Sequence, residues 1–286
     1  MPLLLVRDSR AVEDRERYRR AGHVGGLARC RIHGNPGTVE GRRKGGQQSQ
    51  LLFRTNPLLA RQSGVSFKKE IRRPEKCVEL AELVGVILGD GTISKYQVSV
   101  FLGSRHEQML AVHVQESIAR LFGISASLRL MPRNIYGVIA SSRGLVEFLN
   151  GIGLHSGDKI RNRAEIPGWI FESSDLRKAC LRGLVDTDGS VFVHRHTVRK
   201  RVYENLSLSF TSHASLILGG VHRLFSDLNF SPKLNERYGH VFLHRADSVI
   251  RYTKEIGSRN PHHLARYQEF MRRGAGVVER PRLEIV

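Results

Sequence analysis

Two nine-residue stretches, 98 positions apart, decide the fold. The first is Leu83-Val84-Gly85-Val86-Ile87-Leu88-Gly89-Asp90-Gly91, and the second is Leu181-Arg182-Gly183-Leu184-Val185-Asp186-Thr187-Asp188-Gly189. Each is an apolar stretch with helical spacing and a central glycine, and each ends in Asp-Gly before a β-rich run. The recurrence indicates that one domain-sized unit occurs twice in the chain.

The central glycines, Gly85 and Gly183, need a structural reason. A glycine in a helix interior costs roughly 1 kcal/mol relative to alanine. Close approach of two helices is such a reason, because glycine has no Cβ to hold the backbones apart. Two motif helices that touch through their glycines would place Asp90 and Asp188 side by side at one end.

The segments after each motif follow one order of predicted elements. In the first half we expect a hairpin of 92–97 and 98–103, a helix at 107–122, a hairpin of 127–131 and 135–140, and a helix at 144–152. In the second half the corresponding segments are 190–198 and 206–212, 215–228, 233–237 and 240–244, and 248–256. Strands that alternate apolar and polar residues predict antiparallel sheets with one open face.

The predicted fold class is therefore α+β. Two pseudo-symmetric αββαββα repeats form a saddle of antiparallel sheets, preceded by a basic N-terminal extension. We place the extension at residues 1–75, the first repeat at 76–165 and the second repeat at 166–286.

Composition points to a polyanionic partner. The formal net charge is +19 in 286 residues, and 40% of the residues are hydrophobic, so the chain has a core and is not a basic tail. Residues 1–75 alone hold 17 Lys/Arg and 7 Asp/Glu. Three cysteines without CxxC spacing favour a reducing compartment over a disulfide framework. With no stretch of membrane-spanning length, we expect a soluble intracellular protein of the bacterial cytoplasm or nucleoid, or of an organelle.

The two motifs at this spacing resemble the signature of the LAGLIDADG homing endonucleases, in the single-chain type that has both motifs. The resemblance covers roughly residues 76 to 270. It implies a site-specific endonuclease for intron homing, which cleaves both strands of a long asymmetric DNA target. It also implies a monomer whose partner is double-stranded DNA, with no membrane and no obligate protein partner.

Phosphodiester hydrolysis needs a nucleophilic water and stabilisation of charge on the oxygens, and divalent metal supplies both. We predict that Asp90 and Asp188 are catalytic metal ligands, and the resemblance adds the backbone carbonyls of Gly89 and Thr187. All-oxygen ligation suits Mg²⁺, with Mn²⁺ as an alternative and Ca²⁺ as a substitute without cleavage. Asp186 has no acidic counterpart in the first motif, which favours a structural role.

Members of the family also use peripheral basic residues to order water around the metals. Aligning Ile152-Gly153 with Ile256-Gly257 places Arg251 near the family's basic position. Arg251 is therefore the third predicted catalytic residue.

A β-surface can lie in the major groove, where all four base pairs are distinguishable. The candidate DNA-contacting residues are Arg42, Arg43 and Lys44 in the extension, Lys95, Gln97, Arg129 and Arg133 in the first repeat, and His194, His196, Lys233, Asn235 and Arg237 in the second. The glycines around the basic triplet either let the backbone approach DNA closely or form a flexible linker, and both interpretations stand. His194 and His196 share one strand face and could form a pair of zinc ligands. Because no Cys or third His stands at metal spacing, we expect them to contact DNA instead.

Two alternatives use the same fold. One is an RNA maturase that helps an intron to fold, and the other is a DNA-binding regulator that has lost catalysis. Because adjacent carboxylates that face phosphate bring a binding module no advantage, Asp90 and Asp188 favour an enzyme over the regulator. The endonuclease is the leading prediction, and the RNA maturase stays its alternative.

Overall fold

The computed structural model describes residues 38–62, 70–103, 107–198 and 201–273. The chain divides into two compact units, Met1–Phe67 and Lys68–Val286. In the first unit the described residues form helices α2 (Val39–Thr55) and α3 (Pro57–Gln62). None of the helices in the described part of the chain is long and apolar enough to cross a membrane.

The basic triplet of the extension lies inside helix α2, which corrects the expectation of an open, glycine-rich backbone. The Thr38 side chain caps the helix by accepting from the backbone N–H of Gly41 at 3.0 Å. Glu40 lies in the first turn and pairs with Lys44 at 2.8 Å. These local interactions favour the helix in spite of its glycines, and Arg42 and Arg43 are exposed on it.

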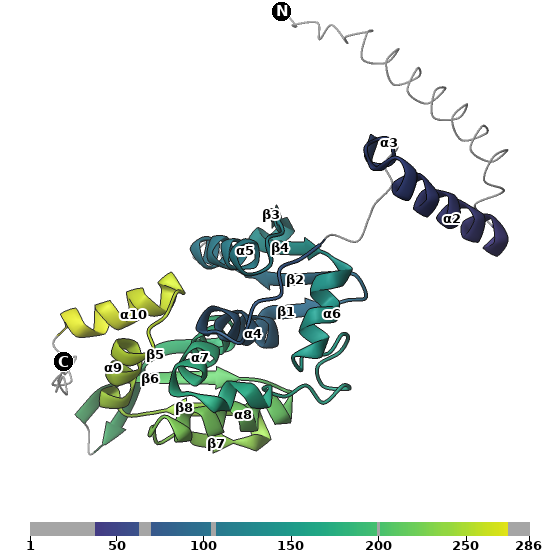
Figure 1. The fold of residues 1–286 in the computed structure, drawn as a ribbon. Helices are drawn as coiled ribbons and strands as arrows, with labels where there is room; N and C mark the ends of the chain where they lie inside the picture. Colours follow the sequence, from purple (N-terminus) through teal and green to yellow (C-terminus); the bar gives the residue numbers. More distant parts are fainter. Residues whose placement is uncertain (1–37, 63–69, 104–106, 199–200, 274–286) are drawn as a thin grey trace, which may run out of the picture. The chain divides into compact units, whose positions relative to one another are not determined.

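The second unit contains the predicted αββαββα order twice, so the fold class is confirmed (Figure 1). The first repeat consists of α4 (Val78–Asp90), β1 (Gly91–Ile93), β2 (Gln97–Leu102), α5 (Gln108–Phe122), β3 (Ser127–Met131), β4 (Ile135–Ser141) and α6 (Arg143–Gly151). The second consists of α7 (Ser174–Asp188), β5 (Gly189–Val198), β6 (Arg201–Thr211), α8 (Ser215–Asp227), β7 (Lys233–Asn235), β8 (His240–Leu243) and α9 (Ala246–Glu255).

Each repeat builds one four-stranded antiparallel sheet, with strand orders β1-β2-β4-β3 and β5-β6-β8-β7. Apolar residues such as Val100 and Val138, which are paired across β2 and β4, are fully buried. Leu208 and Leu243 are likewise paired across β6 and β8 and are buried. Helices of each repeat pack on its sheet, and side chains on the opposite face alternate with these core residues.

Helices α4 and α7 lie side by side between the two sheets (Figure 1). A Cβ at Gly85 would lie 2.2 Å from the carbonyl oxygen of Cys180, and one at Gly183 would lie 2.2 Å from that of Glu82. Neither distance is tolerable for a real side chain, so the backbones touch at both glycines. The predicted close approach of the motif helices is therefore confirmed.

The glycines that follow the two aspartates serve a sharp helix-to-strand transition. Gly91 and Gly189 have extended backbone (φ −85° and −96°), so neither supplies a left-handed cap. A Cβ would instead lie 2.6 Å from the carbonyl oxygen of Ile87 or 2.3 Å from that of Val185. The absence of a side chain lets each motif helix pass directly into the first strand of its sheet.

Several elements differ from the prediction, and the largest differences concern β1, β6 and one additional helix. Strand β1 ends at Ile93, because the backbone N–H of Ser94 bonds to the carbonyl of Gln97 at 2.8 Å and closes a turn. Strand β6 begins at Arg201, five residues earlier than expected. Helix α10 (Pro261–Arg272) was not predicted, although its capping Asn260 and N-terminal proline are standard start signals.

The contact between the motif helices generates a stability prediction. Gly183→Ala should destabilise the protein by at least about 2 kcal/mol, because the new methyl group overpacks a backbone contact. Gly219→Ala is the matched control: this glycine lies in helix α8, and a Cβ there meets nothing within 4 Å. The control should gain about 0.5–1 kcal/mol from helix propensity. Urea denaturation measures both, and equal effects would contradict the proposed helix contact.

Candidate active site

Asp90 and Asp188 end the two packed helices, and both are half-buried. A Cβ at Gly89 would lie 1.9 Å from the hydroxyl oxygen of Thr187 and 3.2 Å from Oδ2 of Asp188. The end of one helix therefore touches the side chains at the end of the other. The structure thus brings together the four residues predicted as metal ligands, while their role in metal binding stays a prediction.

Lys159 joins this group, although the sequence analysis did not single it out. It is half-buried, and its ammonium donates a hydrogen bond to the backbone carbonyl of Gly89. The surrounding segment is anchored to the first sheet by the backbone N–H of Gly157, which bonds to the carbonyl of Ile93 at 2.9 Å. The segment also turns on itself, because Asp158 Oδ1 accepts from the backbone N–H of Arg161 at 2.8 Å.

The electrostatics of the group are those of crowded, partly dehydrated charges. Burial, the neighbouring Asp188 and Glu107 raise the pKa of Asp90 to about 7, against the effect of Lys159. Burial also raises the pKa of Asp188 and lowers that of Lys159. One ammonium does not neutralise two carboxylates, so a further cation at this position would relieve their repulsion.

The donor set at the two aspartates fits a hard divalent cation. In the described ranges no three His, Cys, Asp or Glu side chains converge as metal ligands. Asp90 and Asp188 would therefore supply two carboxylates, and the remaining ligands would be oxygens of the backbone, of water and of a bound phosphate.

Glu107 connects the two repeats beside this group. Its Oε2 accepts from the backbone N–H of Gly103 at 2.6 Å, and its Oε1 accepts from the side-chain amide of Asn260 at 3.2 Å. Asn260 also donates to the backbone carbonyl of Asp186 at 2.9 Å. These bonds hold a third carboxylate near Asp90, where it adds to the negative potential.

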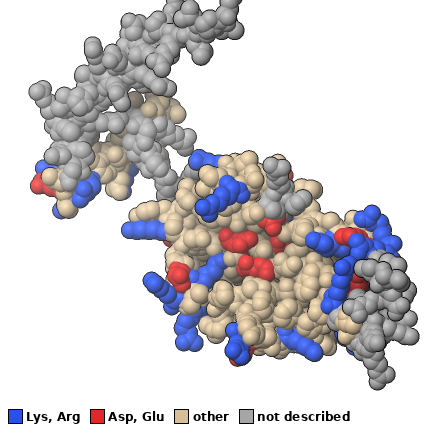
Figure 2. All heavy atoms as spheres, turned by 180° about the vertical axis from the view of Figure 1, so that it is seen from behind, with Lys and Arg blue, Asp and Glu red and all other residues tan. Residues whose placement is uncertain are grey.

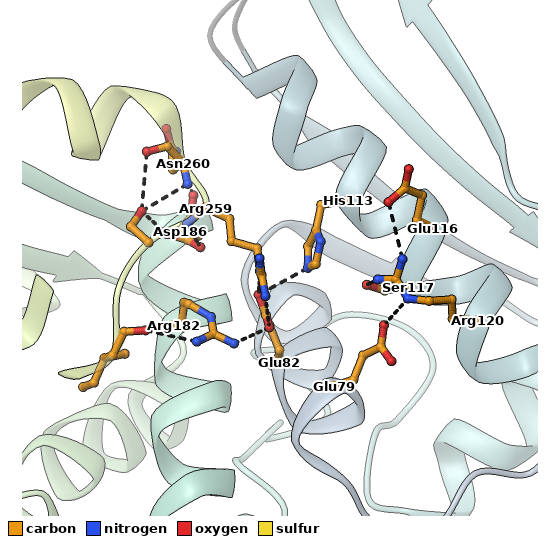
Figure 3. Close-up of polar contacts among 12 residues, drawn as sticks. Glu79, Glu82, His113, Glu116, Ser117, Arg120, Arg182, Asp186, Arg259 and Asn260 are labelled. Atoms are coloured by element: carbon orange, nitrogen blue, oxygen red, sulfur yellow. Dashed lines mark hydrogen bonds and ion pairs between the residues drawn. The ribbon is translucent and has the colours of Figure 1, made fainter. Parts of the chain in front are cut away.

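Asp186 is fully buried and organises the chain that follows α9 (Figure 3). Its Oδ1 accepts from the hydroxyl of Ser258, and its Oδ2 accepts from the backbone N–H of Arg259 at 2.8 Å. Because these bonds satisfy both carboxylate oxygens, Asp186 has the structural role that the sequence favoured.

Glu82 fixes the opposite end of the helix contact (Figure 3). Its buried carboxylate accepts from the guanidinium groups of Arg182 and Arg259, and it lies 3.3 Å from the imidazole of His113. Burial alone would raise the pKa of Glu82, but these hydrogen bonds hold it well below its usual range. The carboxylate therefore links residues from both repeats through charge-assisted bonds.

Arg251 does not join the aspartates. Its guanidinium donates to the carbonyl of Leu228 at 2.9 Å, lies 3.9 Å from the ring centroid of Phe230 and pairs with Glu255 at 3.5 Å. These contacts lie around α8 and α9 and give the predicted catalytic role no support. Lys159, which lies after α6, is instead a basic side chain at the aspartates, whereas Arg251 lies within α9.

The candidate DNA-contacting residues are mostly exposed on strands and hairpin tips. The exposed side chains among them are those of Lys95, Arg129, Arg133, His194, Lys233, Asn235 and Arg237. Gln97 is half-buried and donates to Ser99 at 2.7 Å, and the side chain of His196 lies outside the described part of the structure. On the face shown in Figure 2, acidic atoms gather near the middle of the larger unit and basic atoms lie mostly around them.

Residues 175–258, most of the second repeat, match the family model of the LAGLIDADG-like domain. This part of the chain is therefore similar to a LAGLIDADG-like domain. The resemblance drawn from the two motifs is thereby confirmed.

One curated relative is similar over a short part of its own length. The replication factor C small subunit of Methanocaldococcus jannaschii is 26% identical over 214 residues, which are 73% of this chain and 11% of that protein. The chain thus spans about a tenth of the length of this relative. The similarity therefore concerns one segment of a much longer protein.

Solved structures with a similar arrangement include I-DmoI in complex with DNA and Ca, at 19% identity and a TM-score of 0.43 over 67% of this chain and 97% of that chain. The meganuclease I-SmaMI bound to uncleavable DNA gives 14% identity and a TM-score of 0.46 over 67% and 88%. Full-length DUF199/WhiA from Thermatoga maritima is 14% identical, with a TM-score of 0.44 over 72% of this chain and 64% of that chain.

The raised pKa of Asp90 predicts a pH-dependent stability effect. Between the usual carboxyl pKa of 3.8 and about 7 the folded state retains a proton that the unfolded state has lost. The Asp90 carboxyl therefore lowers the stability progressively as pH rises through this window. Asp90→Asn should raise the unfolding free energy in metal-free buffer at pH 8, by no more than about 4 kcal/mol, and much less at pH 4.

Chemical denaturation at the two pH values measures this difference. Glu75→Gln, at an exposed carboxylate, is the matched control and should change the stability little at either pH. Equal stability of Asp90→Asn and the unsubstituted protein at pH 8 would contradict the electrostatic account.

Proposed function

We propose that this chain is a site-specific DNA endonuclease that hydrolyses phosphodiesters with Mg²⁺. The observation that carries the proposal is the pair Asp90 and Asp188 at the ends of two helices in backbone contact, with Lys159 beside them. The net charge of +19 supports a nucleic-acid substrate.

The residues that would hold the metal are the carboxylates of Asp90 and Asp188 and the backbone carbonyls of Gly89 and Thr187. When bound, divalent metal supplies a water of lowered pKa and stabilises charge on the phosphoryl oxygens. Burial of the two carboxylates strengthens their attraction for a cation, because few water molecules screen the charges. Mn²⁺ can replace Mg²⁺ in this oxygen-rich environment, and Ca²⁺ would bind without supporting cleavage.

Lys159 is proposed as a group that acts on the substrate. Its ammonium fixes the carbonyl of Gly89 and adds a positive charge where the scissile phosphate would arrive. Such a charge stabilises the extra negative charge that develops during hydrolysis. The lowered pKa of Lys159, caused by burial, also brings the ammonium nearer to proton exchange with a bound water.

One molecule would bind one long, asymmetric duplex, because both motifs are in one chain and the two sheets carry different side chains. Each sheet would cover one half of the target through its open face, and the helix α2 residues Arg42, Arg43 and Lys44 would add backbone contacts. A regulator without catalysis would not need two half-buried carboxylates whose charges repel each other, so the site favours the enzyme.

Cleavage assays on a plasmid library with Mg²⁺ test this function. Asp90→Asn and Asp188→Asn should each abolish double-strand cleavage while DNA binding is retained, because they remove a metal ligand and no phosphate contact. Lys159→Met should lower the cleavage rate about 100-fold. Lys254→Met, at an exposed position of α9, is the matched control and should cleave normally. Wild-type rates in both aspartate variants would refute the proposal.

The basic triplet on α2 gives a separate prediction for binding. Replacing Arg42, Arg43 and Lys44 together by alanine should weaken binding and flatten the slope of log K against log salt by up to about 3, since each neutralised phosphate contributes roughly 0.9. Alanine at Gln47, Gln48 and Gln50 of the same helix is the control and should leave the slope unchanged. An unchanged slope in the charge variant would show that α2 does not contact DNA.

A further inference from the structure

An aromatic stack runs along the open face of the second sheet. His240 and Phe242 lie on β8, and His244 follows the strand directly. The ring centroids of His240 and Phe242 are 5.3 Å apart. Those of Phe242 and His244 are 4.9 Å apart, and these two rings are nearly parallel, at 18°. The intervening Val241 and Leu243 are buried on the other face, so the three rings point away from the core.

The stack is surrounded by polar groups from the neighbouring strands. Pairing places Lys233 of β7 beside Phe242, and Asn235 beside His240. An open pocket of about 520 Å³ lies here, and it is lined by Lys233, Leu234, Asn235, Glu236, Phe242 and His244. The lining thus places donor and acceptor groups beside an exposed ring, which is suited to contact with base edges.

The imidazole of His240 is held in one orientation. Its Nδ1 lies 2.9 Å from the hydroxyl of Thr211, which β6 places directly across from it. Contact with the tilted ring of Phe242, at 40° and 5.3 Å between centroids, restrains the imidazole further. With Nδ1 engaged, Nε2 is the ring nitrogen that stays available to a ligand.

The first repeat presents a different surface at the corresponding strand. On the open face of β4 the side chains are those of Ile135, Ile139 and Ser141, with Gly137 between them. None of these groups titrates near neutral pH. The two sheets are therefore chemically unequal at their open faces.

We propose that His240 and His244 are specificity-determining residues for the half of the DNA target that the second repeat covers. The proposal rests on the proposed function and names the side chains that read one half-site. A neutral imidazole presents one donor and one acceptor, whereas an imidazolium donates from both nitrogens. Guanine offers two acceptors, N7 and O6, in the major groove, so protonation of His244 shifts the preference at its position towards guanine.

The surroundings of His244 disfavour its protonated form. Burial, Lys233 and His194 together lower the pKa of His244. Glu236 also lines the pocket and is the acidic group among the lining residues. The β6 residues on this face next to the stack, Ser209 and Thr211, are uncharged. The imidazole of His244 therefore becomes protonated at a lower pH than an ordinary histidine does.

Selection from a randomised duplex library tests this inference with the full-length protein in EDTA, at pH 8 and at pH 5.5. We expect base preferences at one end of the selected site to shift towards guanine at pH 5.5, and those at the other end to stay constant. The double variant His240→Gln, His244→Gln should lose the pH-dependent shift and prefer adenine there, because glutamine pairs with adenine N6 and N7.

Two matched variants locate the effect. Arg129→Gln, on the first sheet, should alter the other end of the site at both pH values alike. His222→Gln, on helix α8, removes a histidine away from this face and should keep the wild-type preferences.

Wild-type preferences at both pH values in the double variant would overturn the inference while DNA recognition stands. If the unsubstituted protein retains no preferred duplex at all, the proposed function fails as well.

Discussion

The backbone contact between α4 and α7 is the constraint on which the rest of the structure depends. At Gly85 and Gly183 the helices approach so closely that no Cβ fits between them. This proximity continues to the helix ends, where the Cβ position of Gly89 overlaps the side chain of Thr187. Two carboxylates from distant parts of the chain are thus forced into one partly dehydrated space, where their charges repel.

Charge is compensated unevenly along this helix pair. Near the start of α4, Glu82 accepts bonds from two arginines, and its negative charge is fully matched. Asp186 is likewise satisfied, by Ser258 and Arg259. At the other end only Lys159 opposes Asp90 and Asp188 among the groups that shift their pKa values. The carboxylates that lack a matching positive charge therefore lie at the ends of α4 and α7, just before Gly91 and Gly189. Such a surplus of negative charge is the expected property of a cation site.

Local patterns predicted most of the fold but fewer of the site's contacts. The motif helices, both hairpin pairs and the pairing of Asp90 with Asp188 follow from periodicity and from glycines in unfavourable positions. Lys159 could not be found in this way, because it lies in an irregular segment and reaches the site through a tertiary contact with Gly89. Helix α2 was missed because its glycines indicated irregular backbone, although Thr38 caps it and Glu40 pairs with Lys44.

The most direct test of the account is the position of a bound metal. Crystals of the protein with a selected duplex and Mn²⁺ should show anomalous density between the carboxylates of Asp90 and Asp188, and Asp188→Asn should reduce it. Strong anomalous density elsewhere on the protein, with none between these two side chains, would contradict the claim that the glycine-packed helices build a cation site.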